Sequence, residues 1–261
     1  MSHWQKYPAQ WNTVGPPLRT SPEVVFLMQD LTGHPTGRVL LLGVTPELAA
    51  GFPRLLAVDK SPDMVRRVWP GDSAEKTAIV GDWLEIDEPP QSFAGVVGDG
   101  SLNNVAWPDE VSRLSQQALR LLRPGARFAC RLFERPAHPL SWSDLARAGT
   151  EPATVNFHAF KWQLAMRISE DHGATLPVTS ILHHFERLFP DRDALSGRTG
   201  WPRRAIDTID VYRGSPLVYC FPNRAEFLRC IPSGAADITF TPCGTYDLAE
   251  CCPVLSFSSP R

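Results

Sequence analysis

The sequence predicts an α/β fold with a doubly wound, mostly parallel sheet, an inserted helical cap and a C-terminal antiparallel hairpin. Three observations predict it. Four short apolar runs in the first hundred residues each end at a glycine or an aspartate, helix-forming segments alternate with these runs, and the alternation stops after residue 134. The runs cover residues 38–42, 55–58, 77–81 and 93–98.

Each apolar run is expected to be a buried parallel strand, because strands covered on both faces are continuously apolar. Short helices are expected near residues 46–50 and 61–68. A longer amphipathic helix is expected after Pro108, where apolar residues recur at the helical period. A turn at Pro124-Gly125 then precedes a fifth strand over 127–133. Strands that alternate with helices in this way imply right-handed crossovers.

The N-terminal segment has a different composition. Ser21, Pro22 and Glu23 suit the N-cap, the first position and the first turn of a helix, which we expect over 22–31. The residues before it are rich in aromatic residues and proline. Trp4 and Trp11 are expected either to form a strap that covers the edge of the sheet or to close over a ligand.

Residues 135–215 contain more helix than one crossover needs, with helices expected after Ser141, over 155–172 and over 181–188. A chain leaving the fifth strand starts at the carboxyl edge of the sheet, so we expect these helices to form a cap over that edge. Later apolar segments, including 217–221, are expected to supply the last strands. The sequence therefore divides the chain into four segments: strap and helix (1–37), Rossmann-like core (38–134), cap (135–215) and last strands (216–261).

Composition limits the possible partners. A net charge of −2 argues against nucleic acid as a partner, because phosphate binding needs a concentrated basic face. No apolar run is long enough for a membrane span, and the polar N-terminus lacks the apolar stretch of a signal peptide, so we expect a cytoplasmic protein. The six cysteines contain no CxxC pair, so reduced thiols are expected and no metal site.

Five motifs together resemble the class I (Rossmann-like) S-adenosylmethionine (SAM)-dependent methyltransferases. They lie in this family's order and cover about residues 20–134. The resemblance implies SAM as cofactor, S-adenosylhomocysteine (SAH) as product, and transfer of a methyl group. The size of the expected cap favours an enclosed pocket, and therefore a small-molecule acceptor. The motifs are Val39-Leu40-Leu41-Leu42-Gly43-Val44-Thr45, Ala57-Val58-Asp59-Lys60-Ser61-Pro62-Asp63-Met64, Gly81-Asp82-Trp83, Gly98-Asp99-Gly100-Ser101-Leu102-Asn103 and Leu119–Phe128.

The first two motifs supply candidate ligands for the ribose and the methionyl tail. Asp59 ends the second strand, where a carboxylate can accept hydrogen bonds from both ribose hydroxyls, and Lys60 and Met64 follow it. Gly43 allows a close approach of backbone to ligand, and Thr45 is a candidate donor to the tail. The sequence departs from the family here, because this loop contains one glycine where the family usually has two or three.

The later motifs carry candidates for the rest of the cofactor. The resemblance places Gly81, Asp82 and Trp83 beside adenine, with Asp82 accepting from its amino group and Trp83 packing on the ring. It places Asp99, Gly100 and Ser101 beside the methionyl amine and the transferred methyl, with Asp99 pairing with the ammonium. Outside the motifs, a guanidinium at Arg19 could bind the cofactor carboxylate.

Catalytic candidates come from the cap. Methyl transfer needs a general base only where the acceptor must be deprotonated, and His158 and His183 are the candidates for that role. Phe157, Phe160 and Trp162 are expected either to line an acceptor pocket or to form the core of the cap.

Two other functions stay open. The single-glycine loop keeps a non-catalytic SAM- or SAH-binding or regulatory protein on the same fold possible. A nicotinamide-dependent oxidoreductase is less favoured, because the chain lacks the GxGxxG motif of that class.

Overall fold

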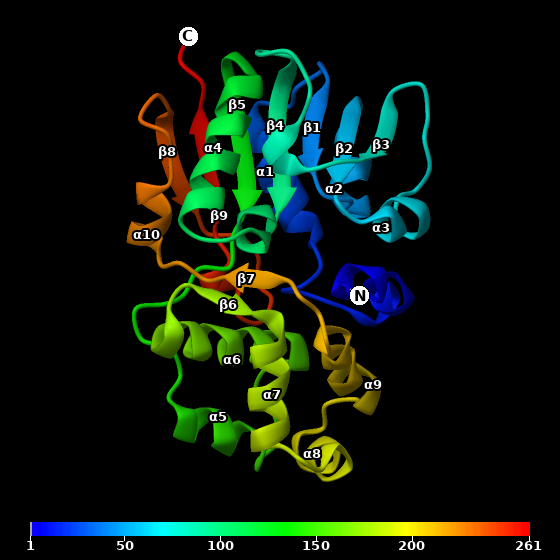
Figure 1. Cartoon of the computed structure of the whole chain (residues 1–261), viewed down its shortest axis with the longest axis vertical. Helices are drawn as coiled ribbons and strands as arrows, with labels where there is room; N and C mark the ends of the chain where they lie inside the picture. Colours follow the sequence, from blue (N-terminus) through cyan, green and yellow to red (C-terminus); the bar gives the residue numbers. More distant parts are fainter. Residues whose placement is uncertain (1) are drawn as a thin grey trace.

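A seven-stranded sheet dominates the computed structural model, which describes residues 2–261 (Figure 1). Its strand order is β3-β2-β1-β4-β5-β9-β8. The first five strands are parallel, and β9 runs antiparallel to both β5 and β8. The predicted α/β sheet and its C-terminal hairpin are therefore confirmed. The strands are β1 (Val39–Leu42), β2 (Leu55–Asp59), β3 (Lys76–Val80), β4 (Phe93–Asp99), β5 (Leu122–Arg131), β8 (Ala236–Thr241) and β9 (Val254–Ser258).

Two apolar cores cover the two faces of this sheet. Helices α1 (Pro22–Thr32) and α2 (Pro46–Gly51) pack with Leu41 on one face, and α4 (Asp109–Leu121) and α10 (Arg224–Arg229) pack with Leu40 on the other. Neighbouring strand residues point to opposite faces, so the continuous apolar run at 39–42 is buried on both sides. The short elements α3 (Pro62–Arg67), η3 (Trp83–Glu85), η4 (Ser101–Asn104) and η6 (Ala249–Cys251) lie in the connections.

The cap lies at the carboxyl ends of the parallel strands, as predicted (Figure 1, lower half). Its α5 begins where expected, since the Ser141 hydroxyl accepts the N–H of Asp144 at 3.1 Å. The buried centre of the cap is formed mainly by α6 and α7. The elements of the cap are α5 (Trp142–Ala148), α6 (Phe157–His172), α7 (Val178–Leu188), α8 (Arg192–Thr199), α9 (Arg203–Ile206) and η5 (Asp207–Tyr212).

Residues 217–221 do not join the main sheet, which corrects the expectation for this segment. Strand β7 (Val218–Cys220) instead pairs antiparallel with β6 (Thr175–Pro177) in a separate two-stranded sheet beside the cap. The reason is that β9 already occupies the free edge of β5 over residues 127–131. An edge that is fully hydrogen-bonded offers no groups to a further strand.

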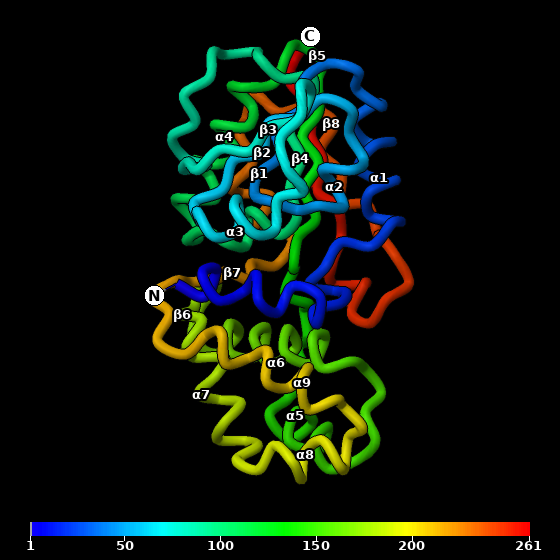
Figure 2. Tube along the Cα trace, turned by 90° about the vertical axis from the view of Figure 1, so that its right-hand side faces the viewer, coloured from blue at the N-terminus to red at the C-terminus, as the bar shows by residue number. Residues whose placement is uncertain are grey.

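The N-terminal strap, η1 (His3–Gln5) and η2 (Tyr7–Thr13), crosses between the sheet domain and the cap (Figure 2). It contacts α3 on one side and η5 on the other. His3 is fully buried, with Nε2 2.8 Å from the Tyr219 hydroxyl and Nδ1 3.1 Å from Ser215 Oγ. Burial lowers the pKa of His3 to about 3, so a neutral imidazole holds the strap to the cap.

Within residues 2–261, none of the helices is both long enough and apolar enough to span a bilayer.

Candidate functional site

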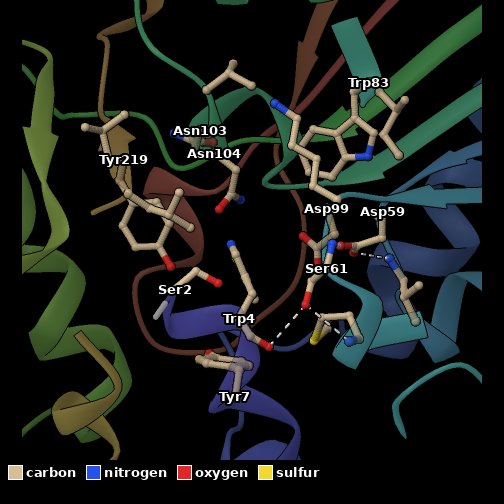
Figure 3. A pocket seen from close by; sticks show the side chains of 18 of the residues that line it. Ser2, Trp4, Tyr7, Asp59, Ser61, Trp83, Asp99, Asn103, Asn104 and Tyr219 are labelled. Carbon is tan, nitrogen blue, oxygen red and sulfur yellow. Dashed lines mark hydrogen bonds between the residues drawn. The ribbon is translucent and has the colours of Figure 1, made fainter. Parts of the chain in front are cut away.

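A cavity of about 400 Å³ lies where the sheet, the cap and the strap meet (Figure 3). Its volume lies within the range of small-molecule sites. One half is built on the carboxyl ends of β1, β2 and β4. The other is built on the strap, β7 and α6, together with η4, the start of α4 and the segment after β5. The first half is lined by Leu42, Gly43, Val44, Thr45, Asp59, Lys60, Ser61, Met64, Trp83 and Asp99. The second is lined by Ser2, Trp4, Tyr7, Trp11, Leu18, Asn103, Asn104, Val105, Glu110, Phe133, Trp162, Pro216, Leu217, Val218, Tyr219 and Phe221.

Asp59 is the polar centre of the first half. It is the last residue of β2, and its two carboxylate oxygens accept backbone N–H groups from Val44 at 3.1 Å and Ser61 at 2.8 Å. These donors fix the carboxylate at the edge of the cavity. Burial raises the pKa of Asp59 to about 6, against the lowering effect of the two N–H donors. A carboxylate so held can accept hydroxyl groups of a ligand.

Gly43 and Trp83 form the wall beside Asp59. Gly43 has φ of 104°, a conformation that favours glycine, and a Cβ there would lie 3.4 Å from Trp83 Cζ2. The indole Nε1 of Trp83 donates to the Val58 carbonyl at 2.5 Å, which holds the ring at the ends of β1 and β2. Thr45, the N-cap residue of α2, also lines this part of the cavity. The predicted Gly43, Thr45, Asp59 and Trp83 therefore come together.

Gly81 and Asp82 do not line the cavity, although Trp83, the next residue of the same motif, does. Asp82 pairs with Lys60 Nζ at 2.9 Å and caps η3 by accepting the N–H of Leu84 at 2.9 Å. Lys60 and Met64 do line the cavity, as expected. The Asp82 carboxylate thus forms an ion pair and a helix cap, and its contact with an adenine amino group stays a prediction.

Asp99 lines the cavity, but its carboxylate is already bound. Arg131 holds it through Nε to Oδ1 at 2.6 Å and Nη2 to Oδ2 at 2.9 Å, and the Thr20 hydroxyl also donates to Oδ2. Arg131 is fully buried and donates through Nη1 to the Tyr246 hydroxyl at 3.0 Å. Asp99 thus already has a guanidinium partner within the protein, and its pairing with a ligand ammonium stays a prediction.

Gly100 and Ser101 have structural roles. Gly100 has φ of 65°, and a Cβ there would lie 2.7 Å from the Phe133 ring, so this glycine makes room for a side chain of the protein and not for a ligand. The Ser101 hydroxyl donates to the Leu42 carbonyl at 2.7 Å and is buried. Neither residue lines the cavity.

Arg19 is engaged outside the cavity. Its Nε pairs with Glu47, and its guanidinium carbon lies 5.5 Å from the centre of the Trp11 ring. Arg19 therefore contacts the lining residue Trp11 without lining the cavity itself, and its contact with a cofactor carboxylate stays a prediction.

Neither proposed histidine base reaches the cavity. His158 is buried beneath the strap, with Nε2 3.3 Å from the Thr13 carbonyl, and burial together with Lys161 lowers its pKa to about 4. His183 is exposed on α7. Helix α6 turns His158 toward the strap, and the amphipathic α7 turns His183 to solvent. Of the three aromatic candidates, Trp162 lines the cavity, whereas Phe157 and Phe160 pack inside the cap.

Trp4 and Trp11, expected either to cover the edge of the sheet or to close over a ligand, line the second half of the cavity, together with residues such as Tyr7 and Tyr219 that were not predicted there. Trp4, Tyr7 and Trp11 recur at intervals of three and four, a spacing that places side chains on one face of a helical segment. Tyr219 and Phe221 alternate along the β7 segment and so share a face. These two periodicities are the sequence features from which this aromatic wall of the cavity could have been predicted.

Neither a protein-family model nor a curated protein sequence matches the chain. Solved structures do resemble it over nearly their full lengths. The N-methyltransferase NodS from Bradyrhizobium japonicum WM9, solved with SAH, has a TM-score of 0.55 at 10% identity and covers 100% of both chains. A putative methyltransferase from Haloferax volcanii, solved with the Trm112 methyltransferase activator, has a TM-score of 0.50 at 12% identity. The match covers 99% of this chain and 95% of that one.

The chain has the class I methyltransferase fold. The sheet order decides this, because dinucleotide-binding folds end in a further parallel strand after β5, whereas this sheet ends in the β8–β9 hairpin. A protein described as a putative Zn-dependent alcohol dehydrogenase from Rhodobacter sphaeroides is also similar, with a TM-score of 0.56 at 12% identity over 100% and 99% of the chains. At such identities the similarity concerns the fold.

The buried pair of Asp99 and Arg131 yields a prediction about stability. Asp99→Ala leaves Arg131 buried without its partner and should lower the free energy of unfolding by about 3–5 kcal/mol, the cost of breaking a buried ion pair. Urea unfolding followed by circular dichroism measures this change. The double variant Asp99→Ala with Arg131→Met removes both charges and should recover more than half of the loss. Equal stability of Asp99→Ala and wild type would contradict the buried pair.

Proposed function

We propose that the protein is a SAM-dependent methyltransferase that acts on a small-molecule acceptor. The observation that carries the proposal is Asp59, a carboxylate held by two backbone N–H groups at the end of β2 and facing a cavity. The solved NodS structure, which has the same fold, contains SAH. The cavity continues beyond the cofactor residues into an aromatic chamber, which supplies room for an acceptor.

The residues of the first half fit the nucleoside part of SAM. The Asp59 carboxylate would accept the two ribose hydroxyls, and Trp83 and Met64 would contact the adenine. Gly43 lets the chain approach the ligand closely, and the Thr45 hydroxyl is available to the methionyl tail. The Asp99–Arg131 pair would lie beside that tail without adding a net charge.

When bound, SAM supplies an electrophilic methyl group on a sulfonium. The contribution of the protein is then to align the acceptor with that methyl and to exclude water, which together can supply much of the rate. The strap and the cap enclose the second half of the cavity with aromatic side chains. Because neither His158 nor His183 lies in the lining, the mechanism assigns no histidine base.

A non-catalytic SAM-binding role on this fold is the alternative. The occupied carboxylate of Asp99 supports it, because a ligand ammonium would lack a free acidic partner there. A radiolabelled methyl-transfer assay with pooled amine and hydroxyl acceptors distinguishes the two functions. Incorporation above the heat-inactivated control supports the enzyme.

The first functional prediction concerns the identity of the cofactor. Isothermal titration calorimetry should show SAH binding with a dissociation constant in the micromolar range, because the first half of the cavity presents a ribose acceptor and an adenine wall. NAD should give no heat at the same concentrations. A lack of response to SAH up to millimolar concentrations would exclude the proposal.

Asp59→Ala should weaken SAH binding by about 1.5–3 kcal/mol, the range for hydrogen bonds to a charged group. The variant should remain folded, because removing this carboxylate also removes the cost of burying it. Asp63→Ala is the matched control, since Asp63 lies four residues later and pairs with Arg66 at 3.0 Å outside the cavity. Equal SAH affinity of the two variants would show that Asp59 does not hold the ribose.

SAH affinity should also depend on pH. The pKa of Asp59 is about 6, so the carboxylate that accepts the ribose hydroxyls forms only as pH rises through that value. Affinity should therefore fall about tenfold from pH 7.5 to pH 5. Asp59→Asn should remove this step, whereas the histidines of the strap and cap, His3 and His158, have pKa values of about 3 and 4 and stay neutral throughout. A step that persists in Asp59→Asn would assign it to another group.

A further inference from the structure

Seven aromatic side chains line the second half of the cavity, and the six of them other than Phe133 define what we call the aromatic box. Three come from the strap and three from the α6–β7 side, so two separate segments close on one space. In Figure 3, Tyr219 faces the cavity from one side and the strap residues Trp4 and Tyr7 from below, where the Trp4 carbonyl accepts the Ser61 hydroxyl at 3.4 Å. The box consists of Trp4, Tyr7, Trp11, Trp162, Tyr219 and Phe221.

Neighbouring rings of the box meet edge to face. The ring planes of Trp162 and Tyr219 lie at 88°, with centroids 5.3 Å apart, and those of Trp162 and Phe221 at 73°. In the strap, Trp4 and Tyr7 meet at 61° and Tyr7 and Trp11 at 69°. Rings set at such angles turn their faces in different directions within each group of three. They suit a compact cation, which is attracted to ring faces from several sides.

The charges around the box also favour a cation. Glu110 is the acidic group of this half of the lining, and its Oε2 accepts the N–H of Ala106 at 2.8 Å, which fixes the carboxylate at the start of α4. The cations nearby have other partners or lie outside the lining. Lys60 pairs with Asp82 and Arg19 with Glu47.

Lys161 is a basic residue close to the box, and its charge would oppose the binding of a cation. It lies behind the box, fully enclosed, with Nζ 5.8 Å from the centre of the Trp162 ring and 5.0 Å from that of Tyr212. Its Nζ has no hydrogen-bond partner within residues 2–261. Burial lowers the pKa of Lys161 to about 7, so about half of its population is neutral at that pH, which weakens its repulsion of a cation in the box.

We infer that the methyl acceptor is an alkylamine whose cationic nitrogen binds in the aromatic box of the cavity that Glu110 also lines; this inference rests on the proposed methyltransferase function. The bound ammonium loses its proton to solvent, and the nitrogen lone pair then forms the bond to the methyl carbon. The C–S bond breaks with its electron pair going to sulfur, which gives SAH and the N-methylated ammonium. The product is again a cation that the same aromatic faces accept.

The test uses three probes of similar shape and different charge: choline, its neutral carbon isostere 3,3-dimethyl-1-butanol, and the anion 3,3-dimethylbutanoate. Binding is measured by calorimetry on the full chain, both with and without saturating SAH. Choline should bind at least tenfold more tightly than the neutral probe, because shape is matched and only the charge differs. Choline binding without SAH reports on the box even if SAH does not bind, so the two proposals can fail separately.

Variants with matched controls locate the probe. Trp11→Leu should weaken choline binding about tenfold and Glu110→Gln about fivefold, while each keeps its circular dichroism spectrum. Trp142→Leu and Asp109→Asn, a half-buried tryptophan outside this cavity and the exposed acid next to Glu110, should leave choline binding unchanged. Equal effects in the variants and their controls would overturn the assignment to the box.

The variant Lys161→Met distinguishes a box that binds a cation from one that binds an anion. If the box instead holds an anion attracted by Lys161, this variant should abolish binding of 3,3-dimethylbutanoate, and that result, with preferred binding of the anion by wild type, would overturn the inference. For an alkylamine acceptor, Lys161→Met should retain or improve choline binding. The variant should fold, because methionine replaces the enclosed chain at similar volume and removes an unpartnered polar group.

Discussion

The buried ion pair of Asp99 and Arg131 is the interaction on which the rest of the site depends. The two residues are register partners at the ends of neighbouring strands β4 and β5. The pair also binds Thr20, just before α1, and Tyr246, in the segment between β8 and β9. Four separate segments therefore meet at one buried charge pair. Two buried charges are tolerated there because each satisfies the other through two hydrogen bonds.

This pair makes an aromatic cavity possible directly beside it. Burial and the Asp99 carboxylate both raise the pKa of Tyr7, so the phenol stays neutral. An unpaired carboxylate at this position would demand water or a counter-ion in the cavity. With Arg131 in place, the wall of the cavity near β4 carries no net charge, and the acidic character of the lining is left to Asp59 and Glu110. The two halves of the cavity thus each contain one carboxylate without a protein cation as partner.

The sequence predicted the elements whose pattern is local. The runs at 39–42 and 55–59 are continuously apolar because the sheet is covered on both faces, and Asp59 follows from its position at the end of such a run. The partner of Asp99 was not predicted, since it depends on which residue of β5 lies opposite it. The placement of 217–221 failed for a similar reason: its alternation is that of a strand, but only tertiary pairing shows that β9 has taken the edge of β5.

The two histidines predicted as bases show what a sequence pattern leaves undetermined. A residue type with suitable chemistry was found in the right segment, but the direction of each side chain depends on how the helix packs. His158 faces the strap and His183 faces solvent, while Trp162, on the same helix as His158, reaches the cavity. In the strap, by contrast, the spacing of Trp4, Tyr7 and Trp11 carried enough information to place all three on one wall.

The single-glycine loop after β1 is explained by the backbone of this loop. Gly43 is the position where the chain has positive φ, and Thr45, with φ of −123°, already serves as the N-cap of α2. The N–H of Val44 donates to Asp59, so this residue orients the carboxylate and does not need the freedom of a glycine. This short loop requires glycine only at position 43, where the backbone has positive φ and passes close to Trp83. The missing glycines therefore reflect an early helix start at Pro46, and they leave the geometry around Asp59 intact.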